Sequence, residues 1–166
     1  MRYFIIIRGP AGVGKSTISQ NLSERLKAYR VSFDKVMSDN GIDKVEGGCI
    51  QLNNFIKADD IVLPEVLDKI ATQIVIFDGC FYYRDQIEDL LKRIPAKSYV
   101  FNLKAGIDEC IARDTKRTGF EGLGNQRVKG VYQLVSRFDY GVNVETSGRT
   151  VNEIVSEILS YLPKKQ

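Results

Sequence analysis

The stretch Gly9-Pro-Ala-Gly-Val-Gly-Lys-Ser16 decides the fold of this 166-residue chain. An apolar run, residues 3–8, precedes it, and an amphipathic stretch, residues 16–29, follows it. The apolar run, ended by a glycine, predicts a strand buried on both faces, and the amphipathic stretch predicts a helix. The pattern G-x-x-x-x-G-K-S between a strand and a helix is typical of a phosphate-binding loop. The alternative is a glycine turn that only caps a helix.

The chemistry of such a loop assigns roles to its residues. Glycines let the backbone curl until its N–H groups converge on phosphate oxygens, and the helix N-terminus adds positive potential. Lys15 is expected to reach the β and γ phosphates as a catalytic cation, and Ser16 to place its hydroxyl on Mg²⁺. The loop residues expected to bind the nucleotide are Gly9, Ala11, Gly12, Val13, Gly14, Lys15, Ser16 and Thr17.

Strand and helix patterns alternate along the rest of the chain. Strands are expected at 30–33, 73–78, 98–103 and 141–145, and helices at 51–71 (interrupted by Pro64), 85–93, 107–117, 126–138 and 151–162. Thr150 and Glu153 have the spacing of a capping box for the last helix. This alternation predicts a three-layer α/β fold with a five-stranded parallel sheet, formed by residues 1–166 as a single domain.

Composition excludes several classes of function. There are 24 Lys and Arg against 21 Asp and Glu, so duplex DNA is not an expected partner. Three separated cysteines and no histidine argue against structural zinc and suit the reducing cytoplasm. The longest apolar run is too short to span a membrane. Both a monomer and a homodimer remain open.

Asp78 ends one of the expected strands, where a Mg²⁺-binding carboxylate of a phosphate-loop protein would lie. It would hold the metal through water or orient the acceptor. The alternative is a strand-end aspartate that caps the turn at Gly79.

Asp34 follows the short strand at 30–33 and would emerge at the carboxyl edge of the sheet, where ligands of open α/β folds bind. A carboxylate there can accept the proton of an acceptor hydroxyl, so we predict Asp34 as the general base. The alternative is an N-cap for residues 35–38.

A basic cluster adjoins a glycine-rich segment that we interpret as part of a lid spanning about 113–127. Arg113, Lys116 and Arg117 precede the segment 118–124, and Arg127 follows it. Arginines brought in by a closing lid can neutralise transferring phosphoryl charge. We predict Arg117 as the catalytic cation, whereas Arg113 would contact the nucleotide base or pair with Glu109. A solvated basic face is the alternative.

The residues after Asp78 are aromatic: Phe81, Tyr82 and Tyr83, followed by Arg84. Their rings would line the acceptor pocket or simply pack beneath a loop. The stretch 51–71 and the turn at 46–49 before it would cover the acceptor side.

The chain resembles the small P-loop kinases grouped around chloramphenicol phosphotransferase, zeta toxin, polynucleotide kinase, gluconate kinase and adenylylsulfate kinase. The resemblance rests on residues 9–17, Asp34, Ile76-Phe-Asp-Gly79, Arg113-x-x-x-Arg117 and Tyr140-Gly-Val-Asn-Val-Glu-Thr146. It implies strand order 2-3-1-4-5, ATP as donor and a loop at 146–148 beside the base. The adjacent carboxylate pair of the chloramphenicol enzyme is missing, so its antibiotic specificity is not implied.

These observations predict an ATP- and Mg²⁺-dependent kinase that phosphorylates a hydroxyl of a small molecule or nucleotide. One alternative is a regulatory nucleotide-binding NTPase, although the chain has no guanine-specifying N-K-x-D. The other is a polynucleotide 5′-kinase, which needs a basic channel for single strands. Residues 40–43 contain no cation and residues 59–60 are both acidic, which disfavours such a channel.

Overall fold

The predicted sheet is present. A computed structural model describes residues 2–117 and 122–164. Its main sheet contains β1 (Tyr3–Arg8), β2 (Tyr29–Ser32), β5 (Val75–Gly79), β6 (Lys97–Lys104) and β7 (Val142–Glu145). All neighbours pair in parallel in the order β2-β5-β1-β6-β7. Counted along the expected strands this is 2-3-1-4-5, so the predicted fold class and order are confirmed.

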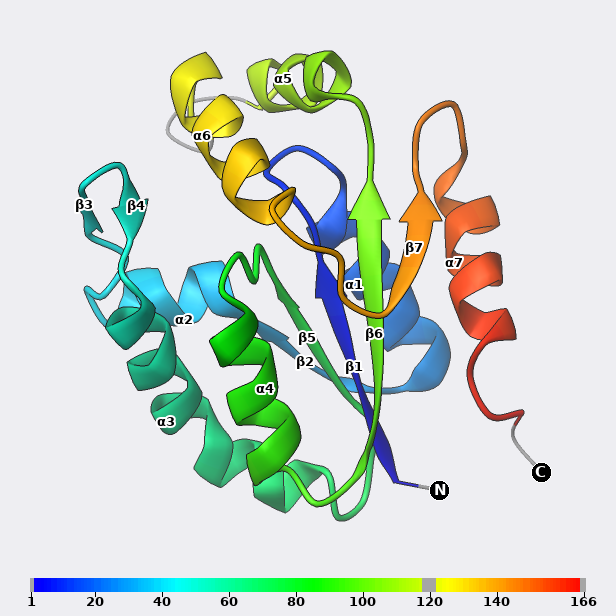
Figure 1. Cartoon of the computed structure of the whole chain (residues 1–166). Helices are drawn as coiled ribbons and strands as arrows, with labels where there is room; N and C mark the ends of the chain where they lie inside the picture. Colours follow the sequence, from blue (N-terminus) through cyan, green and yellow to red (C-terminus); the bar gives the residue numbers. More distant parts are fainter. Residues whose placement is uncertain (1, 118–121, 165–166) are drawn as a thin grey trace.

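Helices cover both faces of the sheet (Figure 1). The helices are α1 (Lys15–Leu26), α2 (Phe33–Asp39), α3 (Leu52–Lys69), α4 (Arg84–Arg93), α5 (Ile107–Thr115), α6 (Asn125–Val135) and α7 (Val151–Ser160). One face carries α2, α3 and α4, and the other carries α1 and α7. The helices α5 and α6 lie at the carboxyl ends of the strands. This edge therefore has helical cover beside the phosphate loop.

Strand β1 shows why the sheet has two cores. Phe4 and Ile6 pack into the core beneath α3 and α4, whereas Ile5 and Ile7 pack into the core beneath α1 and α7. Successive strand side chains point to opposite faces, so a strand buried on both sides must be apolar throughout. The apolar run from Tyr3 to Ile7 is explained by this placement.

The structure differs from expectation on the acceptor side. Helix α3 runs through Pro64 without a break. A proline inside a helix removes one main-chain hydrogen bond, but its buried neighbours Leu63 and Val66 hold this helix against the core. The chain also forms α2 and a small hairpin, β3 (Val45–Glu46) and β4 (Cys49–Ile50), around the predicted glycine turn.

The last helix begins as predicted. The Thr150 hydroxyl accepts from the Glu153 N–H at 3.2 Å, and the Glu153 carboxylate accepts from the Thr150 N–H at 2.7 Å. This is the reciprocal capping box that the sequence indicated. None of the helices in the described part of the chain has the length and apolar character of a membrane span.

Candidate active site

The phosphate loop joins β1 to α1 and curls over the helix N-terminus. Gly14 stands at the N-cap with a φ of 103°, a left-handed conformation that favours glycine. Lys15 folds back across the loop, and its Nζ donates to the Pro10 carbonyl at 2.8 Å. Ser16 and Thr17 are exposed at the start of α1. The loop thus presents a lysine, a hydroxyl and free helix-terminal N–H groups at one place, which suits a polyphosphate.

Gly12 fixes the loop against helix α5. Its φ is +80°, and a Cβ at this position would lie 2.2 Å from the carbonyl oxygen of Cys110. No side chain fits at that distance. Gly12 stands at a variable position of the motif, and here the close contact with α5 requires a glycine in addition to Gly9 and Gly14.

Asp78 lies beside the loop, fully buried at the end of β5. Its Oδ2 accepts from the Ser19 hydroxyl at 2.7 Å and from Arg30 at 2.6 and 2.9 Å. Gly79 still belongs to the strand, so Asp78 bonds to side chains of α1 and β2 instead of capping a turn at Gly79. Its Oδ1 is buried without a hydrogen-bond partner among the described residues.

The groups around Asp78 fit a hydrated Mg²⁺ ion. The Asp78 Oδ1 needs a donor, and a water on a bound metal ion would supply one. Ser16 offers an exposed hydroxyl from the first turn of α1. Within residues 2–117 and 122–164 there is no cluster of three acidic, cysteine or histidine side chains that would form an all-protein metal cage. Magnesium usually keeps waters and relies on substrate phosphates for its remaining ligands, which agrees with this sparse set.

Asp34 lies at the carboxyl edge of the sheet, directly after β2, and its side chain is exposed. Helix α2 begins at Phe33 with Ser32 at the N-cap, so Asp34 is in the first turn and is not the N-cap. The alternative role for Asp34 as an N-cap was wrong. The thiol of Cys80 lies close enough to both Asp34 and Lys15 for their charges to act on it, and burial raises the pKa of that thiol.

Arg113 connects α5 to the phosphate loop. Its Nη1 donates to the Val13 carbonyl at 2.9 Å and to the Thr146 hydroxyl at 3.4 Å, while its Nη2 pairs with Glu109. Glu109 was one of the two partners expected for Arg113, and the nucleotide base was the other. Thr146 is 1% exposed and adjoins Val13, so the loop after β7 lies beside the phosphate loop.

The lid arginines are only partly covered by the described structure. Arg117 is exposed just beyond the end of α5, and Arg127 is exposed in the first turn of α6. Residues 118–121 of the expected lid lie outside the described residues. Asp114, which the sequence reading missed, is buried and accepts from the N–H groups of Leu123 and Gly124 at 3.0 to 3.1 Å. It joins the end of α5 to the start of α6.

Two of the three aromatic residues after Asp78 are buried and pack against other aromatic side chains. Phe81 is 1% exposed and stacks edge-on against Phe33, and Tyr82 is 7% exposed and packs edge-on against Phe55. The packing alternative therefore holds for Phe81 and Tyr82, which are buried within the core that α2, α3 and α4 cover.

Two tyrosine hydroxyls hold the β3–β4 hairpin in place. Tyr82 Oη accepts from the Ile50 N–H at 2.8 Å, and Tyr83 Oη donates to the Ile50 carbonyl at 3.1 Å. Cys49 Sγ lies 3.5 Å from Tyr83 Oη. Burial first, and the contact with Cys49 second, raise the pKa of Tyr83 to about 12. The hairpin is thus tied to the segment that follows Asp78.

Two exposed arginines lie on this side of the site. The Arg84 guanidinium lies 4.8 Å from the centre of the Phe138 ring and 5.3 Å from that of Tyr140. Arg137 is near enough for its charge to act on Tyr83. Neither arginine forms an ion pair with a carboxylate in the described part of the chain. The geometry leaves two cations without an ion-pair partner among the described residues, Arg84 beside the segment after α6 and Arg137 near Tyr83.

Arg8 is a third arginine here, and sequence reasoning missed it because it ends an apolar strand. It is fully buried, and burial lowers its pKa to about 10. It donates to Asn102 and to the carbonyls of Val135 and Phe138, the latter two at 3.0 Å. Arg8 thereby joins the strand beneath the phosphate loop to the end of α6.

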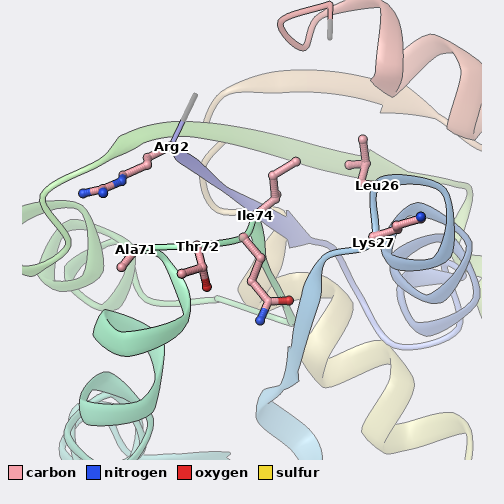
Figure 2. Close-up of a pocket in the computed structure, with 7 residues that line it drawn as sticks. Arg2, Leu26, Lys27, Ala71, Thr72 and Ile74 are labelled. Atoms are coloured by element: carbon pink, nitrogen blue, oxygen red, sulfur yellow. The ribbon is translucent and has the colours of Figure 1, made fainter.

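One hollow of the described structure lies away from this chemistry. Figure 2 shows a cavity of about 410 Å³ at the amino edge of the sheet, lined by Arg2, Lys27, Thr72 and their neighbours. Arg2 and Lys27 point away from each other across it. It lies at the opposite ends of the strands from Lys15 and carries no convergent polar groups.

Comparison with known proteins identifies the family. A family model described as an AAA domain matches residues 4–131. The chain belongs to this AAA domain family. The AAA domain is similar to shikimate kinase of Francisella philomiragia, with 30% identity over 95% of the chain and 93% of the relative. Shikimate kinase of Francisella tularensis subsp. novicida is 28% identical over the same shares.

Solved structures agree in fold. A gluconokinase from Sinorhizobium meliloti superposes with a TM-score of 0.68 at 17% identity, over 96% of this chain and 90% of the other. Shared motifs, relatives and fold agree: this AAA domain is a P-loop kinase, an ATP-using phosphotransferase with a hydroxyl acceptor. The prediction of a P-loop kinase is confirmed. The relatives are shikimate kinases, and the narrower resemblance to chloramphenicol phosphotransferase and zeta toxin is not among these findings.

Proposed function

We propose that this kinase transfers the γ-phosphoryl group of Mg²⁺·ATP to a hydroxyl of a small acceptor that carries an anionic group. The proposal rests on two exposed cations, Arg84 and Arg137, that have no acidic partners among the described residues. Arg84 begins α4 after β5, the strand paired with the one that leads into the phosphate loop, and Arg137 follows α6, whose end is bonded to Arg8 just before that loop. Shikimate, named in the relatives, has hydroxyl groups and a carboxylate on one ring. A hydroxy acid of this kind is the acceptor class we favour.

Different residues of the chain perform different parts of the reaction. The loop amides and Lys15 bind the β and γ phosphates, with Gly9 to Thr17 and Arg113 as the nucleotide-binding set. Asp34 accepts the proton from the acceptor hydroxyl as its oxygen forms a bond to the γ phosphorus. The bond between that phosphorus and the bridging oxygen breaks, and ADP leaves. Lys15 and Arg117 stabilise the charge on the transferring group.

Magnesium would be held by the Ser16 hydroxyl and, through water, by Asp78. When bound, it neutralises phosphate charge in the transition state. Arg30 pairs with the Oδ2 of Asp78 and leaves Oδ1 without a partner among the described residues, so Oδ1 could accept from a metal-bound water. The role of the two side chains is to fix the position of the ion relative to the loop.

Arg84 is well suited to orient an anionic acceptor. Its guanidinium is held by the rings of Phe138 and Tyr140, which limits its motion while leaving its N–H groups free for a carboxylate or phosphate. Arg137 would provide a second set of donors from the end of α6. Together they favour an acid over a neutral sugar.

A screen tests the proposal directly. ADP release is measured with ATP and a panel of hydroxy acids, neutral sugars and nucleosides. We expect turnover with a hydroxy acid, and Arg84→Gln and Arg137→Gln should raise its KM by about tenfold or more, a loss of about 1.4 kcal/mol. Arg25→Gln, on the exposed side of α1, is the matched control. Turnover of neutral sugars alone, or ADP release without any acceptor, would contradict the anionic acceptor.

The proposal also covers the domain organisation, the oligomeric state and the cellular compartment of the protein. We infer a single kinase domain over residues 1–166 with a lid at about 113–127, acting as a monomer or homodimer in the cytoplasm. The free thiols of Cys49, Cys80 and Cys110 suit a reducing compartment. The motif Arg113-x-x-x-Arg117 supports a kinship with the chloramphenicol phosphotransferase and zeta toxin kinases on the donor side.

A further inference from the structure

The two oxygens of the Asp78 carboxylate differ in their hydrogen bonds. Its Oδ2 receives three hydrogen bonds: from Ser19 Oγ at 2.7 Å, Arg30 Nε at 2.9 Å and Arg30 Nη2 at 2.6 Å. Its Oδ1 receives none from the described residues, although it is fully buried. A buried carboxylate oxygen without a donor costs free energy, so this asymmetry needs a reason.

Arg30 does not pair with Asp78 in the usual forked manner. A bidentate arginine places two N–H groups on the two carboxylate oxygens. Here Nε and Nη2 both point at Oδ2, and Nε also donates to Ser19 Oγ at 2.8 Å. The contact neutralises the charge of Asp78 and yet keeps one oxygen free.

The fold brings the three side chains together from separate elements. Arg30 and Ser32 share one face of β2, and Ser32 lies opposite Asp78 in the parallel register. Val31, on the other face, packs beneath α3 and α4. Arg30 therefore faces α1, where Ser19 lies one turn after Ser16, and Ser19 Oγ is also 3.1 Å from the Ser16 carbonyl.

We propose that Arg30 is a positioning residue for the metal carboxylate. With Ser19 it occupies Oδ2 and fixes the side-chain rotamer of Asp78, so that Oδ1 is presented to a water on the Mg²⁺ ion that Ser16 binds. The inference rests on the proposed role of Asp78 in metal binding. Groups that orient a metal's carboxylate from outside the ligand set commonly contribute 10- to 100-fold to metal affinity, which is the order of effect expected of Arg30.

Charge and geometry predict opposite results, which makes the idea testable. If Arg30 acted only as a nearby positive charge, removing it would strengthen binding of a divalent cation. If Arg30 orients Asp78, removing it weakens that binding although a repulsive charge has gone. A lysine at position 30 keeps the charge but offers no planar fork, so it should restore only part of the effect.

The experiment measures Mn²⁺ binding to the protein saturated with ADP, by electron paramagnetic resonance of free Mn²⁺. We expect Arg30→Met to raise the Mn²⁺ dissociation constant by about tenfold or more, and Arg30→Lys to give an intermediate value. Ser19→Ala should weaken binding in the same direction but less. Affinity for ADP without metal should stay unchanged in all three. Arg25→Gln is the matched control on α1.

Each result of the Mn²⁺ measurement either supports the proposed role of Arg30 or overturns it. Tighter or unchanged Mn²⁺ binding in Arg30→Met overturns the proposal, as does a lysine variant with the wild-type constant. If the methionine variant does not fold, Arg30→Lys and Ser19→Ala carry the test, and wild-type binding in both refutes it. Asp78→Asn separates this inference from the proposed function, because wild-type Mn²⁺ binding in that variant would remove Asp78 from the metal site altogether.

Discussion

Arg113 donates a hydrogen bond from α5 to the main-chain carbonyl of Val13 in the phosphate loop, at 2.9 Å and across 100 residues of sequence. The contact joins the helix that leads into the expected lid to the loop that binds the nucleotide. Thr146 accepts from the same Nη1 at 3.4 Å. Three segments distant in sequence therefore meet at the site where the donor nucleotide is expected.

We expect Arg113→Ala to weaken nucleotide binding, because it removes the charged donor to the Val13 carbonyl and leaves only the longer contact from the Thr146 hydroxyl, at 3.5 Å. The loss of a hydrogen bond to a charged group is about 1.5 to 3 kcal/mol, which corresponds to roughly a 10- to 150-fold rise in the ATP dissociation constant if all of it appears in binding. Isothermal titration with ATP measures it. Arg25→Ala, an exposed arginine in the last turn of α1, serves as control. An unchanged constant would show that Val13 holds its position unaided.

Lys15→Ala should abolish turnover, because no other side chain in the described structure occupies its position over the loop. The measurement is ADP release with the acceptor found in the screen. Lys92→Ala, on the exposed side of α4, should leave the rate unchanged. Residual turnover within tenfold of the parent protein would rule out the assigned role of Lys15.

Asp34→Asn should lower kcat by about a hundredfold or more while ATP still binds, since a carboxamide cannot accept the hydroxyl proton. Single-turnover kinetics and ATP titration separate the two effects. Asp68→Asn, exposed at the far end of α3, is the control. If the Asp34 variant keeps full activity, the base assignment is incorrect.

Gly12→Ala should disrupt the phosphate loop, because the new Cβ would lie 2.2 Å from the Cys110 carbonyl and the residue would keep a φ of +80°. Loss of ATP binding and a lower melting temperature are both expected. Gly130→Ala, in a helix with open space around it, should be neutral or stabilising by up to about 1 kcal/mol. Normal ATP binding by the Gly12 variant would mean that the loop can move away from α5.

We expect the buried carboxyl of Asp59 to make the free energy of unfolding depend on pH. It is fully buried between α3 and α4, and burial, partly offset by the hydrogen bond from Gln86, raises its pKa to about 8 from 3.8. The nearby Asp89 raises the pKa further and Arg93 lowers it. The folded state thus binds a proton that the unfolded state releases between about pH 4 and 8, so stability falls as pH rises through this window.

The slope should approach about 1.4 kcal/mol per pH unit inside that window and vanish above it. Urea denaturation at pH 5, 6.5 and 8 measures it. Asp59→Asn should flatten the profile, since the carboxamide keeps the bond to Gln86 and cannot ionise. Equal slopes for the parent and the Asn variant would show that Asp59 does not titrate in this range.

The sheet and the phosphate loop were predictable because their signals are local. The apolar run at Tyr3–Arg8 and the spacing of Gly9, Gly14 and Lys15 fix a strand, a turn and a helix within a few residues of each other. The capping box at Thr150 is equally local. In contrast, α2 and the β3–β4 hairpin are short, and the hairpin is held by tyrosine hydroxyls from beyond β5.

The sequence by itself determined a phosphate-binding loop on a parallel α/β sheet, since hydrophobic period and glycine spacing act over short stretches of chain. Only the tertiary structure decided that Arg30 holds Asp78, that Arg8 joins β1 to α6, and that Asp114 accepts from the main chain at the start of α6. Those partners meet because parallel strands bring distant segments to one edge, and no periodicity in the sequence records which side chains will face each other there.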